Sequence, residues 1–67
     1  MNYLEYLRRK QGIQQQTLAK RLQIHPSTLN RCERGWLTKP PRGLEKKLQT
    51  YFGIEWTFSR LMENVPD

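Results

Sequence analysis

The sequence predicts an all-α fold, a compact bundle of about five short helices. Two observations lead to this prediction. Apolar residues recur at helical spacing, as at Leu18, Ala19 and Leu22, and this pattern is typical of a helix with one buried face. Valine and isoleucine are too few and too scattered to build a sheet.

The first three helices are expected in the first half of the chain. The first covers about residues 2–11 and ends at Gly12, since glycine readily takes the left-handed conformation that follows many helices. The second covers about residues 15–22. The third covers about residues 26–34 and begins at Pro26, because a missing N–H loses no partner in the first helical turn.

Hydrophobic staples support the second and third helices. A staple pairs the apolar residue before the N-cap with the fourth residue of the helix. Ile13 and Leu18 have this spacing at the second helix, and Ile24 and Leu29 have it at the third, with His25 as the N-cap. The two staples imply two short helices with a tight connection.

The second half of the chain is expected to begin with a loop. Residues 36–43 contain two prolines and few large apolar side chains. A fourth helix then begins at Leu44 and stops at Gly53, and a short fifth helix lies around Phe58. Residues 63–67 form a short acidic tail, of which the last three residues, 65–67, are expected to fray.

Length and composition argue against several classes of protein. A chain of 67 residues is one small domain and buries only about 60% of its unfolded surface, so a deep enzymatic cleft is not expected. One cysteine cannot form an internal disulfide, and no secretion signal is recognisable. No apolar run approaches the roughly 20 residues that span a membrane. We therefore expect a cytoplasmic protein that is not an enzyme and has no membrane contact.

The basic residues are concentrated in the middle of the chain. Eleven lysines and arginines lie from Arg8 to Lys47 against two glutamates, whereas residues 48–67 are slightly acidic. A basic surface favours a polyanionic partner, because each neutralised phosphate releases counterions. The alternative is a solvated surface that only keeps the protein soluble.

Two short helices with a tight turn in a basic sequence have the geometry of a helix-turn-helix. The run from Gly12 to Gly35 reads GIxQxxLAxxLxIxxSTLxxCERG. It resembles the Cro/C1-type (Xre-like) helix-turn-helix domain of phage and bacterial transcriptional repressors, which has the lambda repressor-like fold. The resemblance covers about residues 4–61. It implies sequence-specific binding of double-stranded DNA at an inverted-repeat operator, by a repressor that is a homodimer at least on DNA and needs no cofactor.

The resemblance also implies roles for individual residues. Gln15 matches a glutamine that bonds a DNA phosphate and braces the next helix. Arg8 and Glu33 match an arginine and a glutamate that form a partly buried ion pair. Lys39 and Arg42 lie in the loop where the family contacts the DNA backbone, and such contacts position the protein without reading sequence.

Base reading is expected from the face of the third helix opposite Leu29 and Cys32. Arg31 is the foremost candidate, because its guanidinium can bond guanine O6 and N7 together; the alternative is an ordinary phosphate contact. Thr28 points more sideways and is either a phosphate ligand or a plain surface residue. The candidate DNA-binding residues are Gln15, Gln16, Ser27, Thr28, Asn30, Arg31, Arg34, Lys39 and Arg42.

The only cysteine and the only histidine invite a catalytic or metal site, which we do not expect. Cys32 lies on the buried stripe of the third helix with Leu29, as Leu18 and Ala19 do on the second. No second histidine or cysteine exists to complete a metal site. A cysteine–histidine nucleophile would also need a pocket that a short chain does not supply.

Three features depart from the family pattern. Pro26 stands where the family often has a glutamine that reads bases. Gln23 stands where the turn often has glycine, so a left-handed backbone there would cost about 1 kcal/mol. Trp36 and Leu37 are conspicuous in the loop, and Trp36 is either a contact to the dimer partner or a cap over the core.

Two other functions remain open for the same fold. The chain could be an antitoxin or adaptor that mainly holds a protein partner, such as a toxin or RNA polymerase. It could also be the controller of a restriction-modification system. Such a protein would bind DNA by the same mechanism as the repressor but would have a different physiological role.

Overall fold

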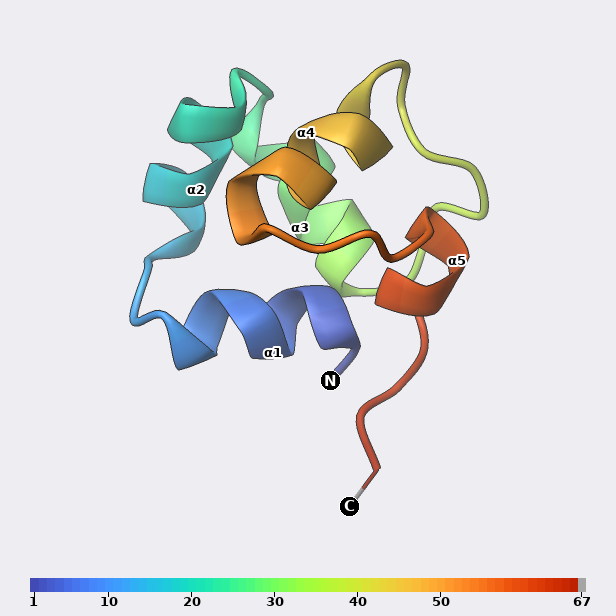
Figure 1. Cartoon of the computed structure of the whole chain (residues 1–67). Coiled ribbons are helices and arrows are strands. Elements are labelled where there is room, and N and C mark those ends of the chain that lie inside the picture. The colour runs from blue at the N-terminus through green and yellow to red at the C-terminus, as the bar shows by residue number, and fades with distance from the viewer. Residues whose placement is uncertain (67) are drawn as a thin grey trace.

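Five α-helices follow one another in the computed structural model, which describes residues 1–66 (Figure 1). The predicted all-α class is confirmed, and these residues contain no β-strand. Within the same range, no helix is long and apolar enough to cross a lipid bilayer. The helices are α1 (Tyr3–Lys10), α2 (Gln15–Leu22), α3 (Pro26–Glu33), α4 (Leu44–Phe52) and α5 (Phe58–Leu61).

Three of the helices begin at a residue whose side chain caps the first turn. The carboxamide oxygen of Asn2 accepts from the N–H of Glu5 at 3.0 Å at the start of α1. The ring of His25 accepts from the N–H of Ser27 at 3.1 Å, which confirms this residue as the N-cap of α3. Thr57 caps α5 in the same way. Each cap satisfies a backbone donor that the helix itself cannot pair.

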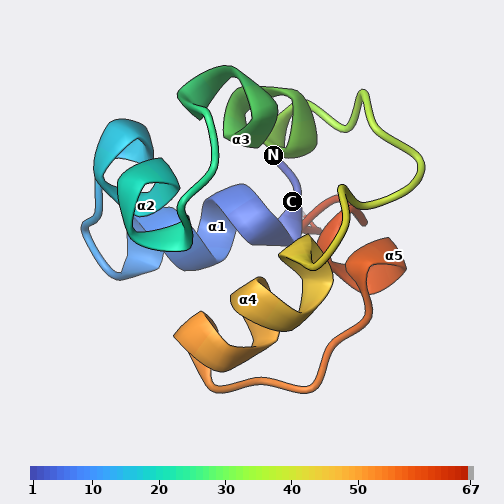
Figure 2. The same cartoon turned by 90° about the horizontal axis from the view of Figure 1, so that it is seen from above.

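The core contains one fully buried leucine from every helix. Leu4, Leu18, Leu29, Leu48 and Leu61 each have an exposed fraction of 0%. Burial of a leucine side chain stabilises a fold by about 1.5–3 kcal/mol, so these residues join all five helices in one cluster. Seen from above, the other helices spread around α1 (Figure 2). α2 packs against α3 and α4, and α1 packs against α3 and α5.

The two ends of the described chain are joined by backbone hydrogen bonds. The N–H of Tyr3 donates to Glu63 O at 3.0 Å, and the N–H of Val65 donates to Met1 O at 2.9 Å. The expectation of a frayed end is therefore wrong for Val65, because its backbone N–H has an acceptor at the start of the chain. Asp67, the last residue of that tail, lies outside the described residues.

Asn2 is a buried polar residue that sequence reasoning missed. Its side-chain nitrogen donates to Cys32 O at 2.8 Å, and its exposed fraction is 3%. This bond fastens the start of α1 to the last turn of α3. The position of asparagine directly before a helix was a readable N-cap signal, but its burial depends on the tertiary fold.

The turn between α2 and α3 contains a left-handed residue at the position where the family often has glycine. Gln23 has φ 58° and ψ 42°, and it is the one non-glycine residue with positive φ among residues 1–66. The N–H of Ile24 donates to Ala19 O at 3.0 Å, which closes the end of α2. The Lys47 ammonium donates to Leu22 O at 3.0 Å and satisfies another terminal carbonyl.

Replacement of Gln23 by glycine is expected to stabilise the protein. Gln23→Gly should raise the free energy of unfolding by about 1 kcal/mol, because glycine adopts positive φ without steric cost. Gln11→Gly is the matched control: Gln11 ends α1 at φ −85°, and there glycine should only lower stability. Urea denaturation measures both changes, and a loss of stability in both variants would contradict the strain at Gln23.

The thiol of Cys32 is expected to be inert in the folded protein. Its exposed fraction is 0%, and burial, with a smaller contribution from the charge of Glu33, raises its pKa to about 11. Iodoacetamide at pH 8 should label the folded protein far more slowly than the urea-unfolded chain. Equal labelling rates would show that the thiol is accessible.

The same pKa shift predicts a pH dependence of stability. The folded pKa lies above the value of about 8.5 expected for an unfolded thiol. Cys32 therefore contributes stability that is fully present below pH 8.5 and is lost as the pH rises towards 11. Denaturation midpoints between these pH values should fall less steeply in Cys32→Ala than in the unchanged protein.

Candidate nucleic-acid interface

Three buried residues determine which face of α3 is free. Leu29 and Cys32 have exposed fractions of 0%, and Glu33 has one of 6%. With this face against the core, the opposite face carries Ser27, Arg31 and Arg34, all exposed. Ser27 and Arg31 are four residues apart, and Arg31 and Arg34 are three apart. These spacings place the three side chains in one line along the helix. This exposed stripe is the part of α3 that can enter a groove of DNA.

Two other predicted contacts flank the exposed stripe. Thr28 and Asn30 are partly buried, and at about 100° per residue they fall on opposite sides of it. Asn30 lies on the side of α2, because its side-chain oxygen is 3.3 Å from Gln15 Nε2. The structure thus divides the predicted DNA-binding residues of α3 into a central line and two edges.

An ion pair lies beneath this face. Arg8 Nε donates to Glu33 Oε2 at 2.5 Å, and Nη2 donates to Oε1 at 3.0 Å. Arg8 Nη1 also donates to Ile13 O at 2.8 Å, which connects the pair to the segment before α2. The hydrogen bond to Glu33 raises the pKa of Arg8, against the opposing effect of desolvation. Glu33 is therefore engaged within the protein although it belongs to α3.

Gln15 connects α2 to this ion pair. Its Nε2 donates to Glu33 Oε1 at 3.1 Å and to Asn30 Oδ1 at 3.3 Å. Both bonds join the first turn of α2 to the second half of α3, which is the bracing that the resemblance implied. The neighbouring Gln16 is exposed and makes no side-chain hydrogen bond within residues 1–66.

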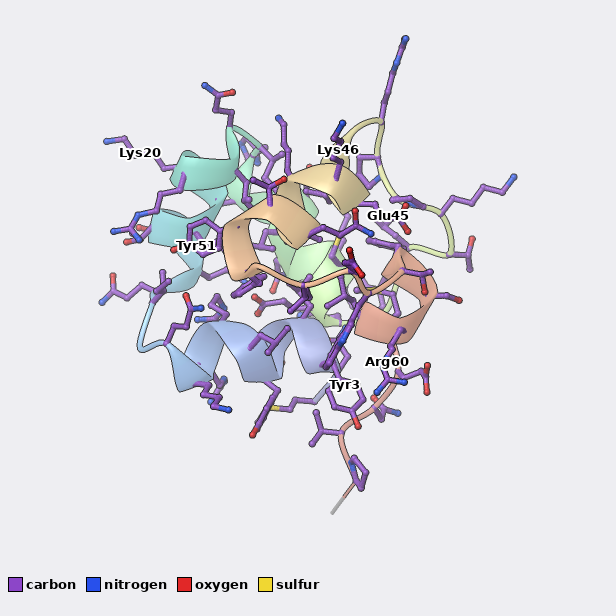
Figure 3. The ribbon with its side chains drawn as sticks, in the orientation of Figure 1. Tyr3, Lys20, Glu45, Lys46, Tyr51 and Arg60 are labelled. Atoms are coloured by element: carbon purple, nitrogen blue, oxygen red, sulfur yellow. The ribbon has the colours of Figure 1, made fainter. Side chains whose placement is uncertain are left out.

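The loop after α3 carries the remaining predicted contacts. Lys39 and Arg42 are exposed, and long side chains project from this loop into solvent (Figure 3). Trp36 has an exposed fraction of 67%, so the interpretation of this residue as a cap over the core is wrong. The Trp36 ring lies 5.6 Å from the guanidinium of Arg34. This cation–π contact with an exposed side chain favours a position of the ring at the protein surface. Leu37 packs partly against the core instead.

Two helix N-termini on the described chain have no side-chain cap. These are α2, preceded by Gln14, and α4, preceded by Gly43. Backbone N–H groups in such a first turn attract anions, since the helix dipole adds a partial positive charge. The first turn of α4 carries both Glu45 and Lys46, and the Lys46 side chain reaches outward (Figure 3).

Some basic residues support the fold in ways that sequence reasoning missed. Arg21 donates to the hydroxyl of Tyr51 at 2.8 Å, and Lys47 caps the end of α2. Arg60 lies over the ring of Trp56 at 4.7 Å. The contacts of Arg21 and Lys47 join residues that are distant in sequence, so no local pattern indicates them.

Neither the cysteine nor the histidine is placed for chemistry. Cys32 is a core residue, and His25 uses its Nδ1 as a helix cap. Among residues 1–66, no three histidine, cysteine or acidic side chains come together as metal ligands. The exposed face of α3 is polar and basic.

Comparison with known proteins identifies the architecture of this face. A family model described as helix-turn-helix, of the Cro/C1 type, matches residues 4–58. No curated protein and no solved structure matches the chain. The matched segment contains α1 to α4 and ends at the first residue of α5, so it includes the ion pair, the brace and the exposed stripe. The chain therefore belongs to the Cro/C1-type helix-turn-helix family of DNA-binding domains.

Proposed function

We propose that this protein is a small transcriptional repressor that places α3 in the major groove of its operator as a homodimer. One observation carries the proposal: the exposed stripe of α3 is polar and basic, while its opposite face is fixed against the core and the ion pair. A rigid helix with such a face suits the recognition helix of a helix-turn-helix.

Base reading is assigned to the exposed stripe. Arg31 lies in its middle and can bond guanine O6 and N7 together, a contact worth about 1–3 kcal/mol of discrimination. Ser27 at the start of the helix donates or accepts and adapts to several bases. Arg34, whose guanidinium lies near the Trp36 ring at the end of α3, is assigned to the backbone of the duplex.

Phosphate binding is assigned to the two sides of α3. The uncapped first turn of α2, with Gln16, forms one anion site, and the uncapped first turn of α4 forms the other. Lys39 and Arg42 add charge beside the second site. Thr28 lies at the edge of α3 and supports a phosphate contact there. Such contacts fix the register of the protein on the duplex.

A homodimer would present two copies of α3 about 34 Å apart on one side of the DNA. The operator is then an inverted repeat with half-sites one turn apart. Occupation of such a site blocks access of RNA polymerase to an overlapping promoter, with the protein acting on DNA in the cytoplasm.

The exposed Trp36 favours a contact with another protein chain, and this observation supports a second candidate function. Tryptophan is enriched at protein interfaces, and its exposed fraction here is 67%. The contact is assigned to the partner subunit of the homodimer. An antitoxin or adaptor would use Trp36 to contact a different protein. A restriction-modification controller would use it, like the repressor, to contact the second subunit of its homodimer.

Selection from a random duplex pool is the experiment that tests the proposed function. The enriched sequence should be an inverted repeat bound by a dimer, and the affinity should fall steeply with salt because several phosphates are neutralised. Analytical ultracentrifugation gives the stoichiometry. A log–log salt slope near zero, or a single asymmetric site bound by one chain, would contradict the proposal.

Arg31 and Lys39 are expected to differ in what they contribute. Arg31→Ala should remove the preference at one base pair at a cost of about 1–3 kcal/mol. Lys39→Ala should weaken all duplexes alike and reduce the salt slope by about 1. Binding profiles across single-base variants of the operator separate the two, and identical profiles would refute this division.

A further inference from the structure

Four side chains form a continuous chain of hydrogen bonds beneath the DNA-facing surface. It runs from Arg8 through Glu33 and Gln15 to Asn30. Arg8 has donors only, and the carboxylate of Glu33 paired with it has acceptors only. Glu33 Oε1 therefore receives a hydrogen from Gln15, and the amide of Gln15 must turn its nitrogen towards α3.

The donor capacity of Gln15 is fully used by these contacts. Its NH₂ group has two hydrogens, and its partners are Glu33 Oε1 at 3.1 Å and Asn30 Oδ1 at 3.3 Å. A phosphate oxygen can only accept. Gln15 could donate to DNA only after one of these internal bonds broke. The role of Gln15 in this structure therefore differs from the phosphate contact that the family resemblance implied.

The orientation of the Asn30 amide follows from the same constraint. Its oxygen faces Gln15 Nε2 and also Arg34 Nε, the latter at 3.4 Å. A reversed amide would place two hydrogens of Asn30 against these two donors. The NH₂ group of Asn30 is thus directed away from the network, and within residues 1–66 it has no acceptor.

We propose that this network fixes the hydrogen-bond polarity of the α2 edge of the interface, so that Asn30 meets DNA as a donor only. The proposal rests on the proposed DNA-binding function. Gln15 is a positioning residue, and its one free group is its acceptor oxygen. Asparagine with both amide groups free bonds adenine N6 and N7 together, but Asn30 has no free oxygen for N6.

The partner of Asn30 is therefore an acceptor on the duplex. Guanine O6, a purine N7, thymine O4 and a phosphate oxygen share this chemistry. Asn30 and Gln15 line a polar hollow together with Arg9 and Arg34, at the place where α1, α2 and α3 meet. A duplex lying along the exposed stripe of α3 passes the rim of this hollow.

Side-chain amide exchange in the free protein tests the network without DNA. In ¹⁵N NMR spectra, the NH₂ hydrogens of Gln15 should exchange with water at least about fivefold more slowly than those of exposed Gln16, because both are bonded. Those of Asn30 should exchange as fast as Gln16. Fast exchange at Gln15, or slow exchange at Asn30, would overturn the proposal whatever the protein binds.

Asn30→Asp then tests the donor on the selected duplex. Aspartate retains an oxygen for Gln15 and Arg34 but replaces the outward donor with an acceptor, so the fold is kept and binding should weaken roughly tenfold. Loss confined to one base pair assigns a base acceptor. Equal loss on all duplexes, beyond that of the control, assigns a phosphate.

Gln11→Glu is the matched control for charge. It makes the same change from amide to carboxylate at the end of α1, at an exposed side chain outside the network and outside the residues assigned to DNA. Binding by Asn30→Asp that equals or exceeds binding by Gln11→Glu would overturn the donor role. Failure of the unchanged protein to enrich any duplex would instead refute the proposed function, while amide exchange still decides the polarity.

Discussion

The ion pair between Arg8 and Glu33 is the interaction on which the recognition surface depends. It lies where α1 meets α3, and through Arg8 Nη1 it also holds the segment that leads into α2. Removal of one partner from such a pair leaves an uncompensated charge and typically costs about 3–5 kcal/mol when burial is complete. The pair is nearly buried, so the geometry of three helices relies on it.

The same pair determines which groups of the surface are hydrogen-bond donors and which are acceptors, as well as the shape of the surface. A carboxylate that can only accept forces the amide beside it to donate, and that amide in turn selects the orientation of the next. Apolar packing holds α3 in place but does not distinguish a donor from an acceptor. The polar layer between α1, α2 and α3 makes that distinction before any ligand arrives.

Local signals made the fold predictable, and tertiary contacts limited what could be said of the site. Apolar spacing, staples and glycines placed the five helices. The bond from Asn2 to Cys32 joins residues thirty positions apart, and no periodicity indicates it. Trp36 stayed ambiguous because hydrophobicity alone does not tell whether a loop residue folds inward. The DNA contacts of the exposed stripe remain predictions.

The five buried leucines, one from each helix, bear on how the protein loses its function. No helix can leave the cluster without exposing a buried leucine, so unfolding should be cooperative and the recognition helix has no separate stability of its own. A defect at Leu61, in the short last helix, would then lower the number of binding-competent molecules in a cell without altering which sequence they prefer.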